Sequence, residues 1–123
     1  MTNDQLEEWV SEYGKAWTSR DPDAAARLFA KDAVYFETPF GPPAKGSSQI
    51  AEYWAAATRS QSNIAFSSQI VCLVDHVGVV RWQASFKRAS AEKRVRLDGV
   101  FLLDFDEKGL CKSLREWWHR EES

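Results

Sequence analysis

The second half of the sequence consists mainly of four long segments that favour β-structure and are separated by short turn signals. The first turn is Asp75-His76, the second is Ser90-Ala91-Glu92, and the third spans residues 106–109 and ends in Gly109, which suits a positive φ angle. Strands joined by such short turns pair as an antiparallel meander, which limits the folds open to this chain. The predicted strands cover residues 63–74, 77–89, 93–105 and 110–120.

The first half of the sequence is typical of helices around a single strand. Apolar residues recur at helical spacing in residues 3–19. Asp21 as an N-cap and Pro22 at the first helical position predict a second helix, which runs through Ala30. The remaining predicted elements are a strand at 33–38, an irregular loop rich in proline and glycine, and a third helix at 47–60.

Helices followed by a long meander indicate the α+β class. A strongly twisted sheet can wrap around the helices and leave a cone with a mouth, where ligands commonly bind. With 123 residues the chain is long enough for one core, so we expect a single domain over residues 1–123. Its six tryptophans exceed what a core of this size needs, so we expect some to line a cavity. The alternative is that they form a solid core.

Composition argues against several classes of partner. The net charge is −2 and the basic residues are scattered, so the clustered positive charge that nucleic acids require is missing. No apolar run approaches the roughly 20 residues that cross a bilayer. The acidic start of the chain is unlike a signal peptide, so we expect a cytoplasmic protein that does not bind membranes. Two cysteines without metal-ligand spacing and two peripheral histidines predict no metal site.

Two groups of residues resemble the nuclear transport factor 2-like superfamily. Residues 19–23 followed by 28–34 (Leu-Phe-Ala-Lys-Asp-Ala-Val) are similar to its entry into the first strand. Residues 105–109 and 114–118 (Leu-Arg-Glu-Trp-Trp) resemble the final hairpin of its SnoaL-like branch. The resemblance covers nearly the whole chain. It implies a cone-shaped α+β fold, with three N-terminal helices packed in a strongly curved, mainly antiparallel sheet, and a homodimer.

Within this superfamily the chain resembles the ketosteroid isomerases at Tyr13, at residues 36–41 (Phe-Glu-Thr-Pro-Phe-Gly) and at Gly46. In those enzymes a tyrosine of the first helix helps to hold the enolate oxygen, and it falls on Tyr13. Their proton-shuttling aspartate falls on Thr38, and a protonated aspartate that also contacts the oxygen falls at or near Phe101. A threonine hydroxyl cannot act as a general base near neutral pH without an activating partner. The steroid isomerase mechanism is therefore not expected here.

Strand alternation predicts which side chains face the cavity. Trp82 and Phe86 share the inward face of one strand, and Phe101 lies on the inward face of the next. The same alternation turns Asp98 outward, unless a bulge at Gly99 reverses it.

Glu116 is the leading acid/base candidate. The isomerase alignment implies that Leu114 and Trp118 point inward, and Glu116 between them then does so as well. Burial between two hydrophobic residues would raise its pKa and suit it to acid/base work. The alternative is an ion pair with an arginine or lysine across the sheet. Glu37, in contrast, is predicted to have a surface role.

Two further residues complete the catalytic candidates. Tyr13 can donate a hydrogen bond to a ligand carbonyl, or it is a core tyrosine with its hydroxyl at the pocket rim. Asp98 is included because SnoaL-like polyketide cyclases use an aspartate of the sheet as acid/base for an aldol closure. The ligand-binding walls are predicted to comprise Trp17, Phe36, Thr38, Trp54, Trp82, Phe86, Phe101, Leu114 and Trp118.

Together these features predict a SnoaL-like protein that binds a small apolar, carbonyl-bearing molecule without a metal or organic cofactor. In the enzymatic version it is an isomerase, cyclase or hydratase in which Tyr13 polarises an oxygen and Glu116 moves a proton. In the alternative it is a non-catalytic ligand-binding or dimerisation domain. In both, the outer sheet face, which includes Trp117, is the expected dimer interface.

Overall fold

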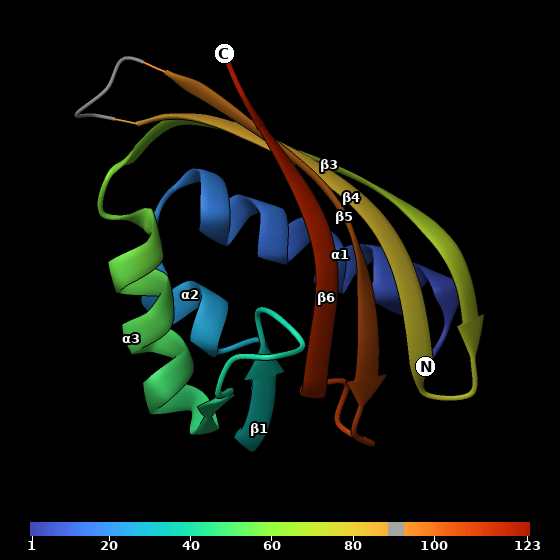
Figure 1. The fold of residues 1–123 in the computed structure, drawn as a ribbon. Helices are drawn as coiled ribbons and strands as arrows, with labels where there is room; N and C mark the ends of the chain where they lie inside the picture. The colour runs from blue at the N-terminus through green and yellow to red at the C-terminus, as the bar shows by residue number, and fades with distance from the viewer. Residues whose placement is uncertain (89–92) are drawn as a thin grey trace.

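The computed structural model describes residues 1–88 and 93–123, and a curved six-stranded sheet forms most of it (Figure 1). The predicted turn at Asp75-His76 is present, Gly109 has the expected positive φ of 82°, and the turn predicted at residues 90–92 lies outside the described residues. The predicted antiparallel meander is confirmed as β3 (Gln61–Val74), β4 (Val77–Arg88), β5 (Arg94–Phe105) and β6 (Cys111–Glu122).

Two more strands extend the sheet beyond β6. Strand β1 (Phe29–Phe36) pairs with β6 in parallel, and the short β2 (Ala44–Lys45) pairs antiparallel with β1. The strand order is therefore β2-β1-β6-β5-β4-β3, a mixed and mainly antiparallel sheet. Strand β2 lies where the sequence predicted only an irregular loop.

The first two helices begin at residues whose side chains cap them. Helix α1 (Asn3–Thr18) starts with a capping box, in which Gln5 N donates to Thr2 Oγ1 at 3.2 Å and Thr2 N donates to Gln5 Oε1 at 2.8 Å. The side chain of Asp21 caps α2 (Pro22–Ala26) by accepting a hydrogen bond from Ala24 N at 3.0 Å. The third helix, α3, covers Gly46–Thr58.

Helix α2 is shorter than predicted, because it ends at Ala26 and not at Ala30. The residues after it enter the sheet: Phe29 pairs with Cys111 of β6, and Cys111 N donates to the main-chain oxygen of Leu28 at 3.0 Å. The Phe29 ring also packs edge-on against Trp9, with 5.6 Å between the centroids. Strand pairing and aromatic packing therefore override the local helical preference.

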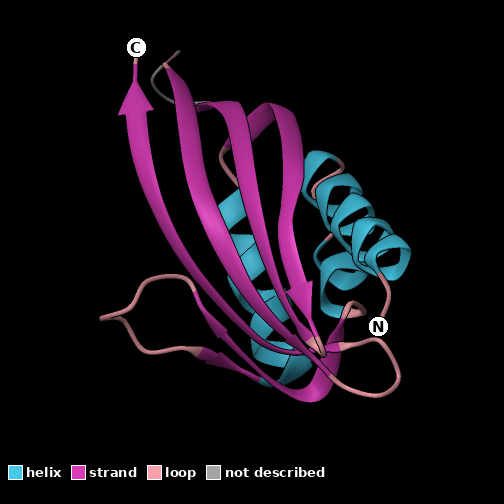
Figure 2. Ribbon diagram, turned by 90° about the vertical axis from the view of Figure 1, so that its right-hand side faces the viewer, coloured by secondary structure: helices cyan, strands magenta, loops and turns pink. Residues whose placement is uncertain are grey.

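All three helices lie on one side of the sheet, which bends around them (Figure 2). Along β4 the buried residues alternate with more exposed ones, as predicted, so that Trp82 and Phe86 face the helices and Arg81 and Gln83 face away. Trp17 of α1 meets Trp82 with 5.7 Å between the ring centroids, and the interior is rich in aromatic rings. The predicted α+β arrangement of helices within a curved sheet is confirmed.

None of the described helices is both long and apolar enough to cross a membrane.

Candidate functional site

A cavity of about 220 Å³ lies between the helices and the concave face of the sheet. Half of the residues that border it are aromatic, and two carboxyl groups are among the others. A concave site that combines aromatic rings with polar groups is typical of small-molecule binding. The bordering residues are Tyr13, Trp17, Tyr35, Glu37, Tyr53, Trp54, Ala57, Thr58, Gln61, Trp82, Phe86, Arg88, Leu97, Glu116, Trp118 and Arg120.

Glu116 is the most deeply buried carboxyl group of the cavity, with only 7% of its surface exposed. It lies between Leu114 and Trp118 on β6, and all three side chains face the helices. The pKa of Glu116 is raised to about 8, mainly by burial; a hydrogen bond from Tyr35 opposes the increase, and the nearby charge of Glu37 adds a smaller one. Near neutral pH Glu116 is therefore mainly an uncharged acid that can donate a hydrogen bond.

Two tyrosine hydroxyls continue from Glu116 in a chain. The Tyr35 hydroxyl donates to Glu116 Oε2 at 3.1 Å, and it lies 2.9 Å from the Tyr13 hydroxyl. A hydroxyl has a single proton, so while Tyr35 donates to Glu116 it accepts from Tyr13. Burial raises the pKa of both tyrosines well above the usual value, so both remain neutral donors.

Glu37 and Tyr53 form a second polar pair at the cavity, and the predicted surface role of Glu37 is wrong. Glu37 is half-buried and borders the cavity, and burial raises the pKa of its carboxyl group while the Tyr53 hydroxyl, its hydrogen-bond partner, lowers it. The indole of Trp118 donates from Nε1 to the main-chain oxygen of Glu37 at 3.0 Å, which fixes this end of β1 against β6.

Seven polar residues that border the cavity were not predicted from the sequence: Tyr35, Glu37, Tyr53, Thr58, Gln61, Arg88 and Arg120. One signal was available, because Tyr53 belongs to the apolar stripe of the third predicted helix. For the strand predicted at residues 33–38, the sequence signal is weak. Tyr35 and Glu37 alternate with Phe36, and the sequence does not show which of the two sets faces inward.

The tryptophan walls occupy the predicted positions, and their indole nitrogens differ in their partners. Trp17 donates from Nε1 to Gln61 Oε1 at 2.8 Å. In contrast, Nε1 of Trp54 and Nε1 of Trp82 are buried and find no hydrogen-bond acceptor among the described residues. Such donors are costly to leave unpaired in an apolar interior.

Gly99 makes room for two of these indoles. It lies opposite Trp82 on one neighbouring strand and opposite Trp118 on the other. A Cβ atom at this position would lie 2.8 Å from Trp82 Cζ2 and 2.9 Å from Trp118 Cβ. The absence of a side chain at Gly99 therefore allows the two tryptophans to lie over the sheet at this level.

Two predicted wall residues of β1 and its following turn do not border the cavity. The Phe36 ring faces the other side of the sheet, where the Arg115 guanidinium lies 4.1 Å from its centroid. Thr38 forms a turn, with its Oγ1 accepting a hydrogen bond from Gly41 N at 3.2 Å. The reason is strand alternation, because Tyr35 and Glu37 take the inward positions.

Phe101 and Leu114 are also absent from the cavity surface, although both are fully buried. The Phe101 ring stacks on Trp82 with 5.0 Å between the centroids and meets Tyr13 edge-on at 5.1 Å. These residues therefore support the wall from behind and would not touch a ligand.

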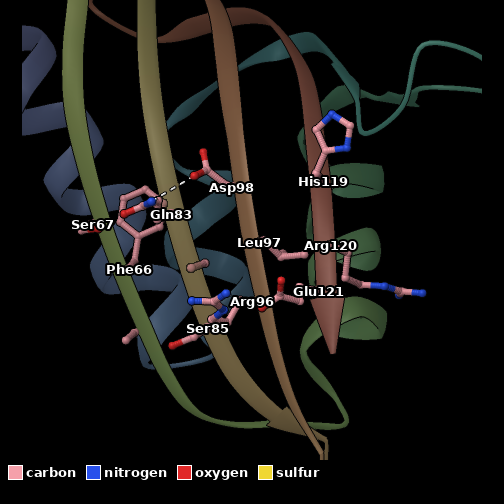
Figure 3. Close-up of a pocket in the computed structure, with 12 residues that line it drawn as sticks. Phe66, Ser67, Gln83, Ser85, Arg96, Leu97, Asp98, His119, Arg120 and Glu121 are labelled. Atoms are coloured by element: carbon pink, nitrogen blue, oxygen red, sulfur yellow. Dashed lines mark hydrogen bonds and ion pairs between the residues drawn. The ribbon is translucent and has the colours of Figure 1, made fainter. Parts of the chain in front are cut away.

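Asp98 lies on the outer face of the sheet, away from the aromatic cavity. It accepts hydrogen bonds from Arg81 at 2.8 Å and from Gln83 at 2.9 Å, which lower its pKa and keep it ionised. It borders an open groove of about 570 Å³, which also contains the ion pair between Arg96 and Glu121 (Figure 3). Alternation along β5 holds without reversal at Gly99, so Asp98 does not meet Glu116 or Tyr13.

The described residues contain no group of three or more potential metal ligands.

Comparisons with known proteins agree with this architecture. The SnoaL-like domain family matches residues 10–114. A hypothetical protein with a ketosteroid isomerase-like fold from Catenulispora acidiphila, solved in complex with trimethylamine, is 20% identical, with a TM-score of 0.80 over 89% of this chain and 84% of that one. SalBIII, an epoxide hydrolase/cyclase-like enzyme with a role in pyran ring formation in the polyether salinomycin, is 19% identical, with a TM-score of 0.82 over 97% and 95% of the two chains.

No curated protein matches the sequence closely enough to count as a relative. The two solved structures share the fold, a cone-shaped α+β arrangement of the nuclear transport factor 2-like type. The family match extends over most of the sequence, from the middle of α1 into β6. The chain therefore belongs to the SnoaL-like domain family.

Proposed function

We propose that the aromatic cavity binds a small apolar molecule with a carbonyl group and that Glu116 acts on this molecule as an acid/base. The observation that carries the proposal is a carboxyl group that is nearly fully buried, borders a cavity of about 220 Å³ and is mainly protonated near neutral pH. An uncharged carboxylic acid in an apolar site can donate a hydrogen bond to a ligand oxygen. Carboxyl groups with strongly shifted pKa values are typical of functional sites.

Tyr13 and Tyr35 support this chemistry from α1 and β1. While Glu116 is protonated, it can donate to the ligand oxygen, and the tyrosine chain limits the directions in which it can turn. As negative charge develops on that oxygen, Glu116 can transfer its proton. Isomerisation, cyclisation and hydration of carbonyl compounds all include such a step, and we propose a reaction of this group. The role of Tyr13 is to hold Tyr35 or, when its hydroxyl is free, to polarise the ligand oxygen directly.

A thermal-shift panel of apolar ketones, enones and lactones tests the proposal, with the wild-type protein compared with Glu116→Gln. A ligand at about 100 times its dissociation constant stabilises the folded protein by roughly 2.7 kcal/mol. The glutamine amide keeps a donor and the shape of the side chain but cannot transfer a proton. We expect a ligand of this class to stabilise both proteins and to be turned over by the wild type alone. If no such compound stabilises either protein, the carbonyl proposal is wrong.

A second candidate ligand is a small ammonium ion, and the observation that favours it is the aromatic wall that also carries Glu37 and Glu116. Aromatic faces attract ammonium groups, and the Catenulispora relative is solved with trimethylamine. The two candidates predict opposite pH effects. A neutral carbonyl ligand should bind more weakly above about pH 8, where Glu116 loses its proton, whereas tetramethylammonium should bind more tightly there. Calorimetric titrations below and above this pH distinguish them.

The non-catalytic alternative also uses the cavity, but as a ligand sensor. In that case a compound would stabilise the wild-type protein and Glu116→Gln equally and would be recovered unchanged from both. Product analysis of the bound compound therefore distinguishes this alternative from an enzyme.

We further propose that the chain forms a homodimer through the outer face of the sheet. Trp117 and Val100 face each other on neighbouring strands there, and 48% and 38% of their surfaces are exposed. Large apolar side chains that lie exposed together on a sheet face favour association. Phe36, beneath Arg115, extends this apolar area on β1.

A further inference from the structure

Two arginines border the aromatic cavity, and the proposed function above gives them no role. Alternation along β4 places Arg88 on the same face as the buried Phe86, and alternation along β6 places Arg120 on the same face as the buried Glu116. Both arginines are partly exposed, with 34% and 47% of their side chains accessible. The cavity therefore has an aromatic interior and a cationic mouth.

The two guanidinium groups share one carboxylate. Among residues 1–88 and 93–123, the ion-pair partner of both is Glu122, whose Oε1 lies 3.6 Å from Arg88 Nε and 3.7 Å from Arg120 Nε. Both distances exceed the roughly 2.7–3.2 Å of a normal N–H···O hydrogen bond. A single carboxylate also balances only one of the two positive charges. The pair of guanidinium groups can therefore accept a further anion.

Both arginines lie beside apolar residues of the cavity wall. The guanidinium carbon of Arg88 lies 5.8 Å from the centroid of the Phe86 ring, within the range of a cation–π contact. Arg120 lies directly opposite Leu97 on the neighbouring strand β5. Phe86 and Leu97 both border the cavity. An apolar molecule in contact with these two residues would bring its outer end close to both guanidinium groups.

A third arginine adds positive charge near the same rim. Arg20, which follows α1, donates from Nη1 to the main-chain oxygen of Gln61 at 3.1 Å. Gln61 borders the cavity, and its side chain accepts a hydrogen bond from the indole of Trp17 at 2.8 Å. Positive charge at the opening of a concave site attracts anionic ligands.

We propose that Arg88 and Arg120 form an anion subsite at the mouth of the cavity and that the ligand is an apolar carbonyl compound with a carboxylate at its outer end. The inference rests on the proposed function for the apolar body and the carbonyl group, and it narrows the ligand to the class of oxo acids. The carbonyl oxygen contacts Glu116 inside the cavity. The ligand carboxylate lies beside the two guanidinium groups, where it competes with Glu122. Because a planar guanidinium can bind a carboxylate through two parallel hydrogen bonds, the subsite orients the ligand as well as holding it.

Three compounds test the subsite, with affinities measured by calorimetry near neutral pH. Benzoylpropionate has an aromatic ring, a ketone and a carboxylate. Benzoylpropionamide has a neutral amide in place of the carboxylate, and phenylbutyrate keeps the carboxylate but lacks the ketone. We expect wild-type protein to bind benzoylpropionate about tenfold more tightly than its amide, and this advantage should decrease with added salt, which screens partly exposed charges.

Three variants assign the advantage to the subsite. Arg120→Gln removes one guanidinium group and should abolish most of the advantage of benzoylpropionate, while the amide binds as before. Glu122→Gln removes the competing carboxylate and should tighten the binding of benzoylpropionate about threefold, a gain that local damage to the fold would not produce. Arg96→Gln is the matched control, because it removes an arginine whose ion pair with Glu121 lies on the outer face of the sheet. It should bind all three compounds as the wild type does.

The outcomes separate this inference from the proposed function. Equal affinity for benzoylpropionate and its amide would overturn the subsite and leave the carbonyl proposal standing, and an advantage that persists in Arg120→Gln would do the same. If phenylbutyrate binds as tightly as benzoylpropionate and with the same dependence on Arg120, the subsite is supported and recognition of the ketone is contradicted. If none of the three compounds binds, the subsite is overturned, and the neutral ketones of the thermal-shift panel still test the carbonyl proposal.

Discussion

At the residue scale, two opposing effects act on the pKa of Glu116. Burial favours the uncharged form of the carboxyl group, and the hydrogen bond from Tyr35 favours its charged form. Removing the hydroxyl with Tyr35→Phe should therefore raise the pKa of Glu116 above about 8. It should also destabilise the fold by about 1–3 kcal/mol, because Tyr13 loses its buried partner. The measurements are an NMR titration and urea unfolding. A lower pKa in Tyr35→Phe would contradict this reading of the bond.

The shifted pKa of Glu116 also predicts how stability depends on pH. Its folded pKa of about 8 lies above the ordinary value of 4.5, so the unfolded chain loses this proton first as the pH rises. This carboxyl group therefore reduces stability progressively between about pH 5 and about pH 8, by up to about 1.4 kcal/mol per pH unit. The Glu116→Gln variant lacks this titrating group, so its stability does not contain this pH-dependent contribution.

The difference in unfolding free energy between the wild type and Glu116→Gln should accordingly move in favour of the glutamine variant as the pH rises through this window. Urea unfolding of both proteins at several pH values checks it. A difference that stays constant would show that Glu116 titrates alike in the folded and unfolded chains.

At the scale of the elements, β5 provides the position on which two tryptophans depend. Gly99→Ala would place a Cβ atom 2.7 Å from the main-chain oxygen of Trp117 and 2.8 Å from Trp82 Cζ2. We expect a loss of about 1–3 kcal/mol, typical of overpacking, together with altered tryptophan fluorescence. Val74→Ala, at the exposed end of β3, is the control and should change stability by at most about 0.5 kcal/mol. A Gly99→Ala variant as stable as this control would contradict the described packing.

Elements whose signals are local were predictable from the sequence. The cap at Asp21 and the alternation in β4 and β5 each involve neighbouring residues, and the structure shows them as expected. The end of α2 was not predictable in this way, because Phe29 is drawn into the sheet by pairing with β6, a segment far away in the sequence.

The same distinction explains which parts of the site were found. Glu116 follows from alternation along β6, where Leu114 and Trp118 mark the inward face. In β1, however, Val34, Tyr35 and Phe36 are all apolar or aromatic, so the strand carries no clear alternation. Its orientation is set by parallel pairing with β6, and a shift of one residue exchanges the two faces. The resemblance to the ketosteroid isomerases places Phe36 and Thr38 at the wall, where the structure has Tyr35 and Glu37.

At the scale of the whole molecule, the proposed homodimer depends on the apolar part of the outer sheet face. Trp117→Glu would place a charge in the centre of that interface, and we expect a dimeric wild-type protein and a monomeric variant in light-scattering chromatography. Phe40→Ser is the matched control, because Phe40 is 99% exposed but lies on a loop outside the sheet. It should remain dimeric. A wild-type protein that stays monomeric at high concentration would exclude this interface.

The proposed function depends most on the charge state of Glu116 inside the aromatic cavity. An NMR titration of the ¹³C-labelled carboxyl groups in the ligand-free protein measures it directly, and Glu116→Gln assigns the signal by its disappearance. We expect a titration midpoint at about 8. A midpoint close to the ordinary 4.5 would show a charged, well-solvated carboxylate and would contradict both the acid role of Glu116 and the described cavity.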